Sequence, residues 1–194
     1  MTALAFNAAD HTYHLGQRQL PGVTSVLQPY YDGLEYVDWQ RLKMLAEFGN
    51  HVHLACHLHN TGELDEDSLD PVVATYLAGW KLFLRQSGYV VTHSEERVYH
   101  KELLYAGTLD NVGHFPPLPK QGRWPCIVDI KTGLTMPRTV GPQTAAYMAA
   151  RGKRMRRFCC LVGPETYKLV ELKDPRDFDI FKAALTLYRW RTGL

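Results

Sequence analysis

The sequence predicts a mixed α/β fold in which a small mixed central β-sheet is flanked by helices. Apolar residues recur three and four apart between about residues 35 and 86, the helical period, and then alternate as in a strand between about residues 95 and 131. With 194 residues, 45% of them hydrophobic and 22% charged, the chain has an ordinary globular composition. We therefore expect one domain over residues 1–194.

Residues 1–90 are predicted to form short strands and turns followed by an N-terminal helical extension. Prolines and glycines interrupt the first 30 residues, so only short strands fit there. One helix is predicted from about residue 35 to residue 60, and Gly62 follows its end. A second helix is predicted from about residue 70 to residue 86, with Pro71 in its first turn and Gly88 after its end.

Residues 91–173 are predicted to form the central sheet with one helix inserted. Strands are expected at about 95–100, 103–115 and 124–131, and the apolar third strand has the composition of a central one. The Pro- and Gly-rich segment 116–123 joins the second and third strands into a hairpin. A helix over 139–151 and strands over 157–163 and 167–172 follow. The last helix, within 174–194, is expected to begin at Asp174-Pro175, a cap residue followed by proline.

Composition and charge exclude several classes of protein. The formal net charge is +2, so attraction of a polyanion must come from local patches. No apolar run is long enough to span a bilayer and the first residues do not resemble a signal peptide, so we expect a cytoplasmic protein without a membrane partner. The four cysteines show no CxxC spacing and lie mostly in apolar runs, which indicates buried free thiols in a reducing compartment.

Two aspartates and a lysine form the centre of the candidate site. Asp110 lies on the predicted strand 103–115 and Asp129 on the strand 124–131, so both carboxylates could reach one divalent cation if these strands pair. Lys131 follows Asp129 by two residues and projects to the same face of its strand. Its ammonium could orient or deprotonate an attacking water, or neutralise a phosphate. Taken alone, Asp129-x-Lys131 also fits an ion pair on the face of a strand.

The segment 51–59 contains four histidines and Cys56, and the sequence leaves three interpretations of it open. It fits a zinc site built from histidine and Cys56. It also fits a polar helix face with partly buried histidines. In the third interpretation one histidine, His53, completes the carboxylate site from a neighbouring helix.

A basic run from residue 151 to residue 157 follows the predicted helix 139–151. It holds five cations in seven residues, and it fits a solvated turn as well as it fits a track along a phosphate backbone. The candidate contacts to a phosphate backbone are Arg151, Arg154 and Arg156. Aromatic residues that fit either core packing or stacking on unpaired bases are Tyr30, Tyr31 and Trp39.

Five short motifs occur in one order along the chain, and together they resemble those of the PD-(D/E)xK nuclease superfamily. Within it, the chain is similar to the branch that contains the RecB nuclease domain, the phage-type exonucleases and the CRISPR-associated iron–sulfur nucleases. The resemblance covers about half of the chain. Its motifs are Gly49 with His53, Glu95 in Glu-x-x-Val, Gly107 to Asp110, Asp129 to Gly133 in Asp-x-Lys-Thr-Gly, and Gln143 to Tyr147 in Gln-x-x-x-Tyr.

The resemblance implies a restriction-endonuclease-like core and a metal centre. It makes His53, Asp110 and Asp129 metal ligands, together with the backbone carbonyl of Ile130. The implied ion is Mg²⁺ or Mn²⁺. The iron–sulfur members need one early cysteine and a late set of three, whereas Cys159-Cys160 is followed by no further cysteine, so no iron–sulfur cluster is expected.

The same resemblance assigns roles to the residues around the metal. Lys131 is implied as the catalytic lysine and Glu95 as a supporting acidic residue, although Glu96 beside it leaves that position open by one residue. Gln143 and Tyr147 are implied to position the lysine or to contact the DNA backbone. Residues 91–173 would then be the catalytic core of a single nuclease domain.

The implied function is a metal-dependent deoxyribonuclease, foremost an exonuclease in phage or prophage DNA recombination, replication or repair. The implied partners are single- or double-stranded DNA ends and a phage recombination or annealing protein, in the host cytoplasm if a phage encodes the chain. Relatives include ring-forming trimers, but no residue here indicates the oligomeric state. Two alternatives are a non-catalytic DNA-binding or recombination accessory protein on the same fold, and a zinc-stabilised protein built on the histidine-rich helix.

Overall fold

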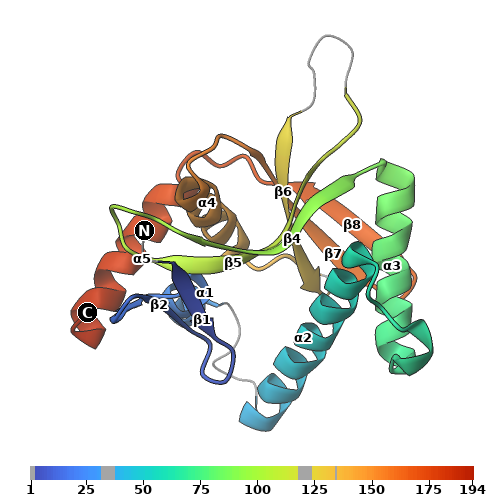
Figure 1. Ribbon diagram of the computed structural model, residues 1–194, viewed down its shortest axis with the longest axis horizontal. Helices are drawn as coiled ribbons and strands as arrows, with labels where there is room; N and C mark the ends of the chain where they lie inside the picture. Colours follow the sequence, from blue (N-terminus) through green and yellow to red (C-terminus); the bar gives the residue numbers. More distant parts are fainter. Residues whose placement is uncertain (1–2, 32–37, 118–123, 134) are drawn as a thin grey trace.

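Two β-sheets and a set of α-helices make up the described structure (Figure 1). The computed structural model describes residues 3–31, 38–117, 124–133 and 135–194. The elements are β1 (Leu4–Asn7), β2 (Thr12–Leu15), β3 (Arg18–Leu20), α1 (Val23–Leu27), η1 (Gln28–Tyr30), α2 (Trp39–Thr61), η3 (Glu66–Ser68), α3 (Pro71–Ser87), β4 (Val90–Tyr99), β5 (Ala106–His114), β6 (Pro125–Thr132), α4 (Val140–Arg151), β7 (Arg156–Gly163), β8 (Thr166–Glu171) and α5 (Asp177–Thr192).

The larger sheet is mixed and has the strand order β4-β5-β6-β7-β8. Strands β4, β5 and β6 pair antiparallel in succession, β6 and β7 are parallel with α4 between them in the sequence, and β8 returns antiparallel to β7. The smaller sheet, β1-β2-β3, is antiparallel throughout. The predicted mixed α/β fold with helices flanking a small central sheet is therefore confirmed, and β6 is its central strand.

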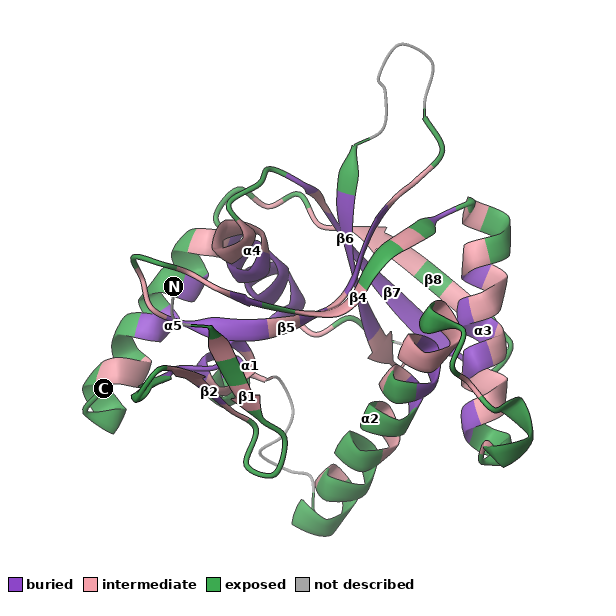
Figure 2. Cartoon of the chain, in the orientation of Figure 1, coloured by how far each residue is buried: buried purple, intermediate pink, exposed green. Residues whose placement is uncertain are grey.

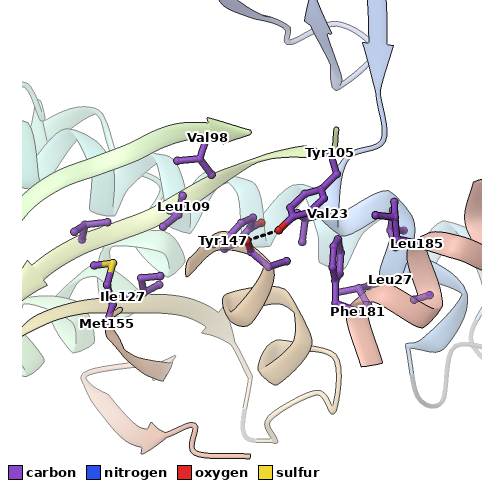
Figure 3. Close-up of a cluster of buried hydrophobic side chains, with 14 residues drawn as sticks. Val23, Leu27, Val98, Tyr105, Leu109, Ile127, Tyr147, Met155, Phe181 and Leu185 are labelled. Carbon is purple, nitrogen blue, oxygen red and sulfur yellow. Dashed lines mark hydrogen bonds between the residues drawn. The ribbon is translucent and has the colours of Figure 1, made fainter. Parts of the chain in front are cut away.

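Helices cover both faces of the larger sheet, and each face has its own hydrophobic core. Helices α2 and α3 pack on one face, while α1, α4 and α5 lie on the other (Figure 1). Burial is greatest in β5, β6, β7 and the helix faces turned toward them (Figure 2). In the core on the α4 side, the hydroxyl of Tyr105 donates a hydrogen bond to the carbonyl of Ala146 at 2.8 Å (Figure 3). The site described below lies between these two cores.

Helix α3 approaches the β7–β8 turn so closely that one position must lack a side chain. A Cβ atom at Gly79 would collide with the backbone carbonyls of Gly163 and Thr166. The contact is fixed further by the backbone amide of Glu165, which donates to the carbonyl of Thr75 at 2.8 Å. Glycine at this helical position therefore sets the distance between α3 and the sheet, since any larger residue would push them apart.

Most predicted elements agree with the structure, and two differ from it. Strand β4 begins at Val90 instead of residue 95, because its first half is a half-exposed edge with a bulge between Val91 and His93, which hides the two-residue period. Helix α5 begins at Asp177 because the Asp174 carboxylate accepts the amide of Arg176 at 2.9 Å and closes a local turn before the helix. The predicted start of the first helix near residue 35 and most of the 116–123 loop lie outside the described residues.

Candidate metal centre

The two predicted aspartates lie where strands β5 and β6 separate. The last paired residues of these strands are Asn111 and Val128, so Asp110 and Asp129 are the next residue on each strand. Beyond this point β5 stays with β4 while β6 stays with β7, and the two strands diverge (Figure 1). The backbone amide of Ile130 donates to Asp110 Oδ2 at 2.7 Å, in a position where a ladder bond would otherwise form. The fork places side chains, instead of a backbone ladder, between the strands.

Three side chains from three elements converge at this fork. His53 of α2, Glu95 of β4 and Asp110 of β5 each offer a ligand atom, and these atoms all lie within 4.8 Å of one another. His53 Nδ1 is 3.4 Å from Asp110 Oδ1. Two carboxylates and one imidazole form a donor set that fits a divalent cation such as Mn²⁺ or Mg²⁺. Of the residues predicted from the sequence, these three are the ones that form a ligand group.

Glu95 enters this group through an unusual backbone conformation. Its φ angle is 55°, in the left-handed region that a non-glycine residue rarely adopts and that costs about 1–3 kcal/mol. Its neighbours Ser94 and Glu96 pair with Asn111 and Leu109, so Glu95 is opposite Asp110 in the β4–β5 register. Glu96 instead accepts two contacts of 3.1 Å from the Nε of Arg151. The acidic residue of the group is therefore Glu95.

The three side chains of this group shift one another's pKa values. Burial, followed by the Asp110 carboxylate, raises the pKa of Glu95 to about 7. Burial also raises the pKa of Asp110, but His53 and Lys131 lower it more. The pKa of Asp110 is therefore below its ordinary value, and this carboxyl is ionised at neutral pH. For His53, burial lowers the pKa, and Asp110 raises it above the ordinary value. The ionised Asp110 carboxylate thus opposes the ionisation of Glu95, and a bound cation would relieve this repulsion.

Asp129 faces Lys131 and α4, outside the group of three. Its side chain is only 1% exposed, and its Oδ1 accepts from Gln143 Nε2 at 3.1 Å. Lys131 Nζ lies 2.7 Å from Asp129 Oδ2, an ion-pair contact that lacks hydrogen-bond geometry, and this buried oxygen has no hydrogen-bond partner among the described residues. Burial raises the pKa of Asp129 to about 6 while Lys131 opposes the shift. Gln143 therefore holds one oxygen of Asp129, and the ammonium of Lys131 lies against the other.

Lys131 is a cation in this environment. Burial lowers the pKa of its ammonium, but Asp129 and Asp110 together raise the pKa above its ordinary range. Of the roles considered for Lys131 from the sequence, stabilisation of negative charge therefore fits better than removal of a proton from water. The side chain is 24% exposed, so it can still reach a ligand that enters from solvent.

Gln143 and Tyr147 lie beneath the centre as buried supports. Gln143 Nε2, which holds Asp129, is also 3.2 Å from the hydroxyl of Tyr147. The two residues are 4% and 2% exposed, so they are positioned to fix Asp129 and not to contact a DNA backbone. A Cβ atom at Gly107 would overlap the ring of Tyr147, so the glycine of the Gly-x-x-Asp motif makes room for this ring. Both motifs thus act on the position of Asp129.

Sequence reasoning missed a chain of hydrogen bonds that holds α2 against the sheet. The indole Nε1 of buried Trp80 donates to Asn60 Oδ1 at 3.0 Å, and Asn60 Nδ2 donates to Asn111 Oδ1 at 2.8 Å. Closer to the centre, His57 Nδ1 and Ser94 Oγ are 2.9 Å apart. These contacts fix the helix that carries His53. The available signal was Asn111 within a predicted strand, since a buried amide needs a hydrogen-bond partner.

The predicted basic contacts are not gathered at the metal centre. Arg151 is paired with Glu96. Arg156 opens β7 opposite Cys126, three residues before the position of Asp129, which is about 10 Å along the strand. Arg154 and Arg156 line a cavity at that end of the sheet.

The aromatic residues considered for base stacking divide between the surface and the neighbourhood of the centre. Tyr30 and Trp39 are 44% and 74% exposed. Tyr31 is half-buried, and burial raises the pKa of its hydroxyl while Lys131 lowers it. Tyr31 therefore lies close enough to Lys131 to interact with its charge.

The zinc interpretation of the histidine-rich helix finds no ligand group of its own. Within the described ranges, the one cluster of three or more His, Cys, Asp or Glu ligand atoms is that of His53, Glu95 and Asp110. Cys56 is buried and not part of it, and burial raises the pKa of its thiol. All four cysteines are buried free thiols, as predicted. No helix in the described part of the chain is long and apolar enough to cross a bilayer.

Comparison with known proteins leaves the family open. No family model matches the sequence, and no curated protein matches it. Among solved structures, the chain is similar to the one titled "Crystal structure of SSO0001", with 12% sequence identity over 91% of this chain and 79% of that chain. The TM-score is 0.39, a similarity too low to bear on the function. What the molecule does must therefore be argued from its own residues.

Proposed function

We propose that this protein is a metal-dependent deoxyribonuclease that hydrolyses DNA phosphodiester bonds at the β5–β6 fork. The observation that carries the proposal is the ligand group of His53, Glu95 and Asp110, with atoms within 4.8 Å of one another, beside the Asp129–Lys131 pair. A hard-cation donor set next to a partly buried ammonium suits chemistry on a phosphate, where negative charge develops. The ordered motifs that resemble PD-(D/E)xK nucleases support the same reaction.

The residues divide the work of hydrolysis between holding a cation and stabilising charge. His53, Glu95 and Asp110 would hold Mg²⁺ or Mn²⁺, with the ion pair of Asp129 and Lys131 nearby. The bound cation would supply Lewis-acid stabilisation of the phosphoryl oxygens and a water of lowered pKa. Lys131 contributes a positive charge toward the scissile phosphate, where it stabilises the transition state.

The chain's remaining residues keep this arrangement rigid. Gln143 holds the Asp129 carboxylate by its Oδ1, so its other oxygen stays directed toward Lys131. The Ile130 amide holds Asp110 in the same way. Side chains fixed by such contacts lose little freedom when a substrate binds, which favours the transition state. The carbonyl of Ile130, implied as a ligand by the resemblance, belongs to the residue that already anchors Asp110.

An exonuclease that acts on DNA ends in phage or prophage recombination, replication or repair is the form that the resemblance favours. The test is cleavage of end-labelled linear single- and double-stranded DNA beside a closed circle, with and without Mg²⁺ or Mn²⁺. We expect loss of the linear species alone, dependent on metal. Cleavage of the circle would instead establish an endonuclease.

Two variants assign the reaction to this centre. Lys131→Ala should abolish cleavage, while Lys101→Ala, which removes an exposed lysine from the β4–β5 connection, should leave it unchanged. Manganese titration by calorimetry on the wild type and Asp110→Asn provides a readout independent of cleavage. If no substrate is cut with either metal although DNA still binds, the protein is the non-catalytic DNA-binding alternative.

A further inference from the structure

A cavity of about 810 Å³ lies at the end of the central sheet where β6 and β7 begin. Its walls come from the base of the β5–β6 hairpin, the end of α4, the first residues of β7, and the segment from β8 to α5. Asp129 follows Cys126, which lies in the cavity wall, by three positions in β6, about 10 Å along the strand. The cavity is therefore separate from the metal centre, and its size is that of a small-ligand site.

The inner lining of this cavity is apolar and aromatic. Phe115 and Trp124 contribute from the two strands of the hairpin, Met148 from α4, and Phe178 from the first turn of α5. Trp124, which is 50% exposed, lines the cavity. Aromatic faces that are open to solvent in a recess can stack on a planar ligand.

Cations gather at the same cavity and exceed the carboxylates there. Arg156 Nε and Lys173 Nζ share one carboxylate, that of Glu171, each at 2.8 Å. The Arg156 guanidinium lies 4.9 Å above the ring of Phe158, and only its Nε is engaged by a partner among the described residues. Arg154 is exposed and forms no ion pair or hydrogen bond with the described part of the chain. The cavity thus presents guanidinium donors beside aromatic rings.

We propose that this cavity binds a nucleotide unit of single-stranded DNA, with its base against Trp124 and its phosphate at Arg154 and Arg156. A guanidinium matches the geometry of a phosphate, and an aromatic face accepts any unpaired base. In a duplex the bases are stacked on each other and cannot enter a recess, so the site selects single strands. The inference does not depend on catalysis at the β5–β6 fork, because no cation is needed for this contact.

Fluorescence anisotropy with a labelled oligothymidylate of about 12 nucleotides tests the proposal in the presence of EDTA, so that no cleavage intervenes. Arg154→Ala should weaken binding about fivefold near 0.1 M salt, and the slope of log K against log salt should fall by about 0.7. Lys153→Ala is the matched control, since this neighbouring exposed cation does not line the cavity. We expect that variant to stay within about twofold of the wild type.

The stacking contact has its own variants. Trp124→Ala should weaken single-strand binding about tenfold at both low and high salt, whereas Trp124→Phe should retain most of it because an aromatic face remains. Circular dichroism confirms that each variant is folded. Binding of a blunt DNA hairpin should not respond to Trp124→Ala.

Three results would overturn this assignment. Wild-type affinity in folded Arg154→Ala and Trp124→Ala would show that the cavity binds no strand. An equal loss in Lys153→Ala would mean a surface charge effect in place of a site. Thymidine monophosphate that binds with Arg154 dependence, while the oligothymidylate does not, would indicate a free-nucleotide site. Because the measurement uses EDTA, none of these results bears on cleavage at the fork.

Discussion

Two groups of buried charges in this molecule are built on opposite principles. At the far side of α4, the Arg157 guanidinium donates to the carbonyl of Gly141 at 2.8 Å, to Asp177 Oδ2 at 2.9 Å and to the carbonyl of Asp174 at 3.3 Å. Its charge has a matching carboxylate and its donors have partners. The candidate metal centre instead brings the carboxylates of Glu95 and Asp110 within 4.8 Å of each other, beside the ion pair of Asp129 and Lys131.

The contrast separates a structural pair from a functional one. A buried ion pair whose donors are hydrogen-bonded has no polar group left to bind a ligand. At the fork, burial and like charge raise the pKa of Glu95 to about 7 and that of Asp129 to about 6. A cation bound there would favour the ionised form of both carboxyls. The substitutions below act on one group or the other, from the largest expected effect to the smallest.

Removal of a ligand at the fork should give the largest effect. We expect Asp110→Asn to lower metal-dependent cleavage by a factor of about 10³ or more, as for the loss of a group that stabilises transition-state charge. Asp67→Asn, an exposed aspartate far from the fork in the sequence, serves as the control. Turnover on linear DNA and the thermal midpoint in EDTA are measured together. Unaltered turnover in a folded Asp110→Asn protein would refute the assignment of the centre.

Removal of one member of the structural pair should act on stability. Arg157→Ala leaves the Asp177 carboxylate buried without its partner, and we expect a loss of about 3–5 kcal/mol in the free energy of unfolding. Urea denaturation measures it. A loss below about 1 kcal/mol would mean that water or a neighbouring cation replaces the guanidinium.

Replacement of both members sharpens the same comparison. In Arg157→Met combined with Asp177→Leu, no charge remains to be desolvated, so we expect stability within about 2 kcal/mol of the wild type. Cleavage should be unaffected, because neither residue belongs to the metal centre. Urea denaturation of Arg157→Met alone, of Asp177→Leu alone and of the double variant gives the coupling energy of the pair, as the difference from additivity.

A neutral side chain at Glu95 should stabilise the metal-free protein at neutral and alkaline pH. The folded-state pKa of Glu95 is raised from 4.5 to about 7, so the protonated form contributes stability that is present below about pH 4.5 and is lost as the pH rises through 7. Glu95→Gln removes this loss, and we expect a gain of about 1–2 kcal/mol near pH 8 that shrinks near pH 5.

The measurement for Glu95→Gln is urea denaturation at both pH values in EDTA, with the metal affinity determined separately. Glu96→Gln is the matched control, because it removes a carboxylate that is paired with Arg151. Stability should fall in that control and rise in Glu95→Gln. The same sign in both variants would show that like-charge crowding at the fork is weak.

Much of the fold was readable from local sequence. The pair of Pro71 and Gly88 set the limits of α3 correctly because proline and glycine act through their own backbone restrictions. The apolar run of β6 predicted a central strand because a strand that is covered on both faces is apolar along its length. The start of α5 was wrong because Asp174 uses its carboxylate in a turn instead of a helix cap, a choice that depends on neighbours the sequence does not place.

The candidate site was readable in its residues but not in its geometry. The motifs named the right strands for Asp110, Asp129 and Glu95, yet the choice between Glu95 and Glu96 depended on a left-handed backbone angle that no propensity predicts. The cations of the 151–157 run fitted a solvated turn as well as a track along a phosphate backbone. Arg151 ends α4 and Arg156 opens β7, and proximity in sequence to α4 does not specify the end of the sheet to which that strand returns.

The amide of Ile130 gives the molecule a built-in spectroscopic reporter. Because this amide donates to Asp110 Oδ2, 2.7 Å from its nitrogen, and not to a neighbouring strand, its chemical shift and its exchange with solvent follow the state of Asp110. Any event that draws the Asp110 carboxylate away would free this one backbone hydrogen while the amides of the paired strands stay protected. A single resonance in a nitrogen–proton spectrum could therefore record occupancy of the fork, even in a variant that carries out no reaction.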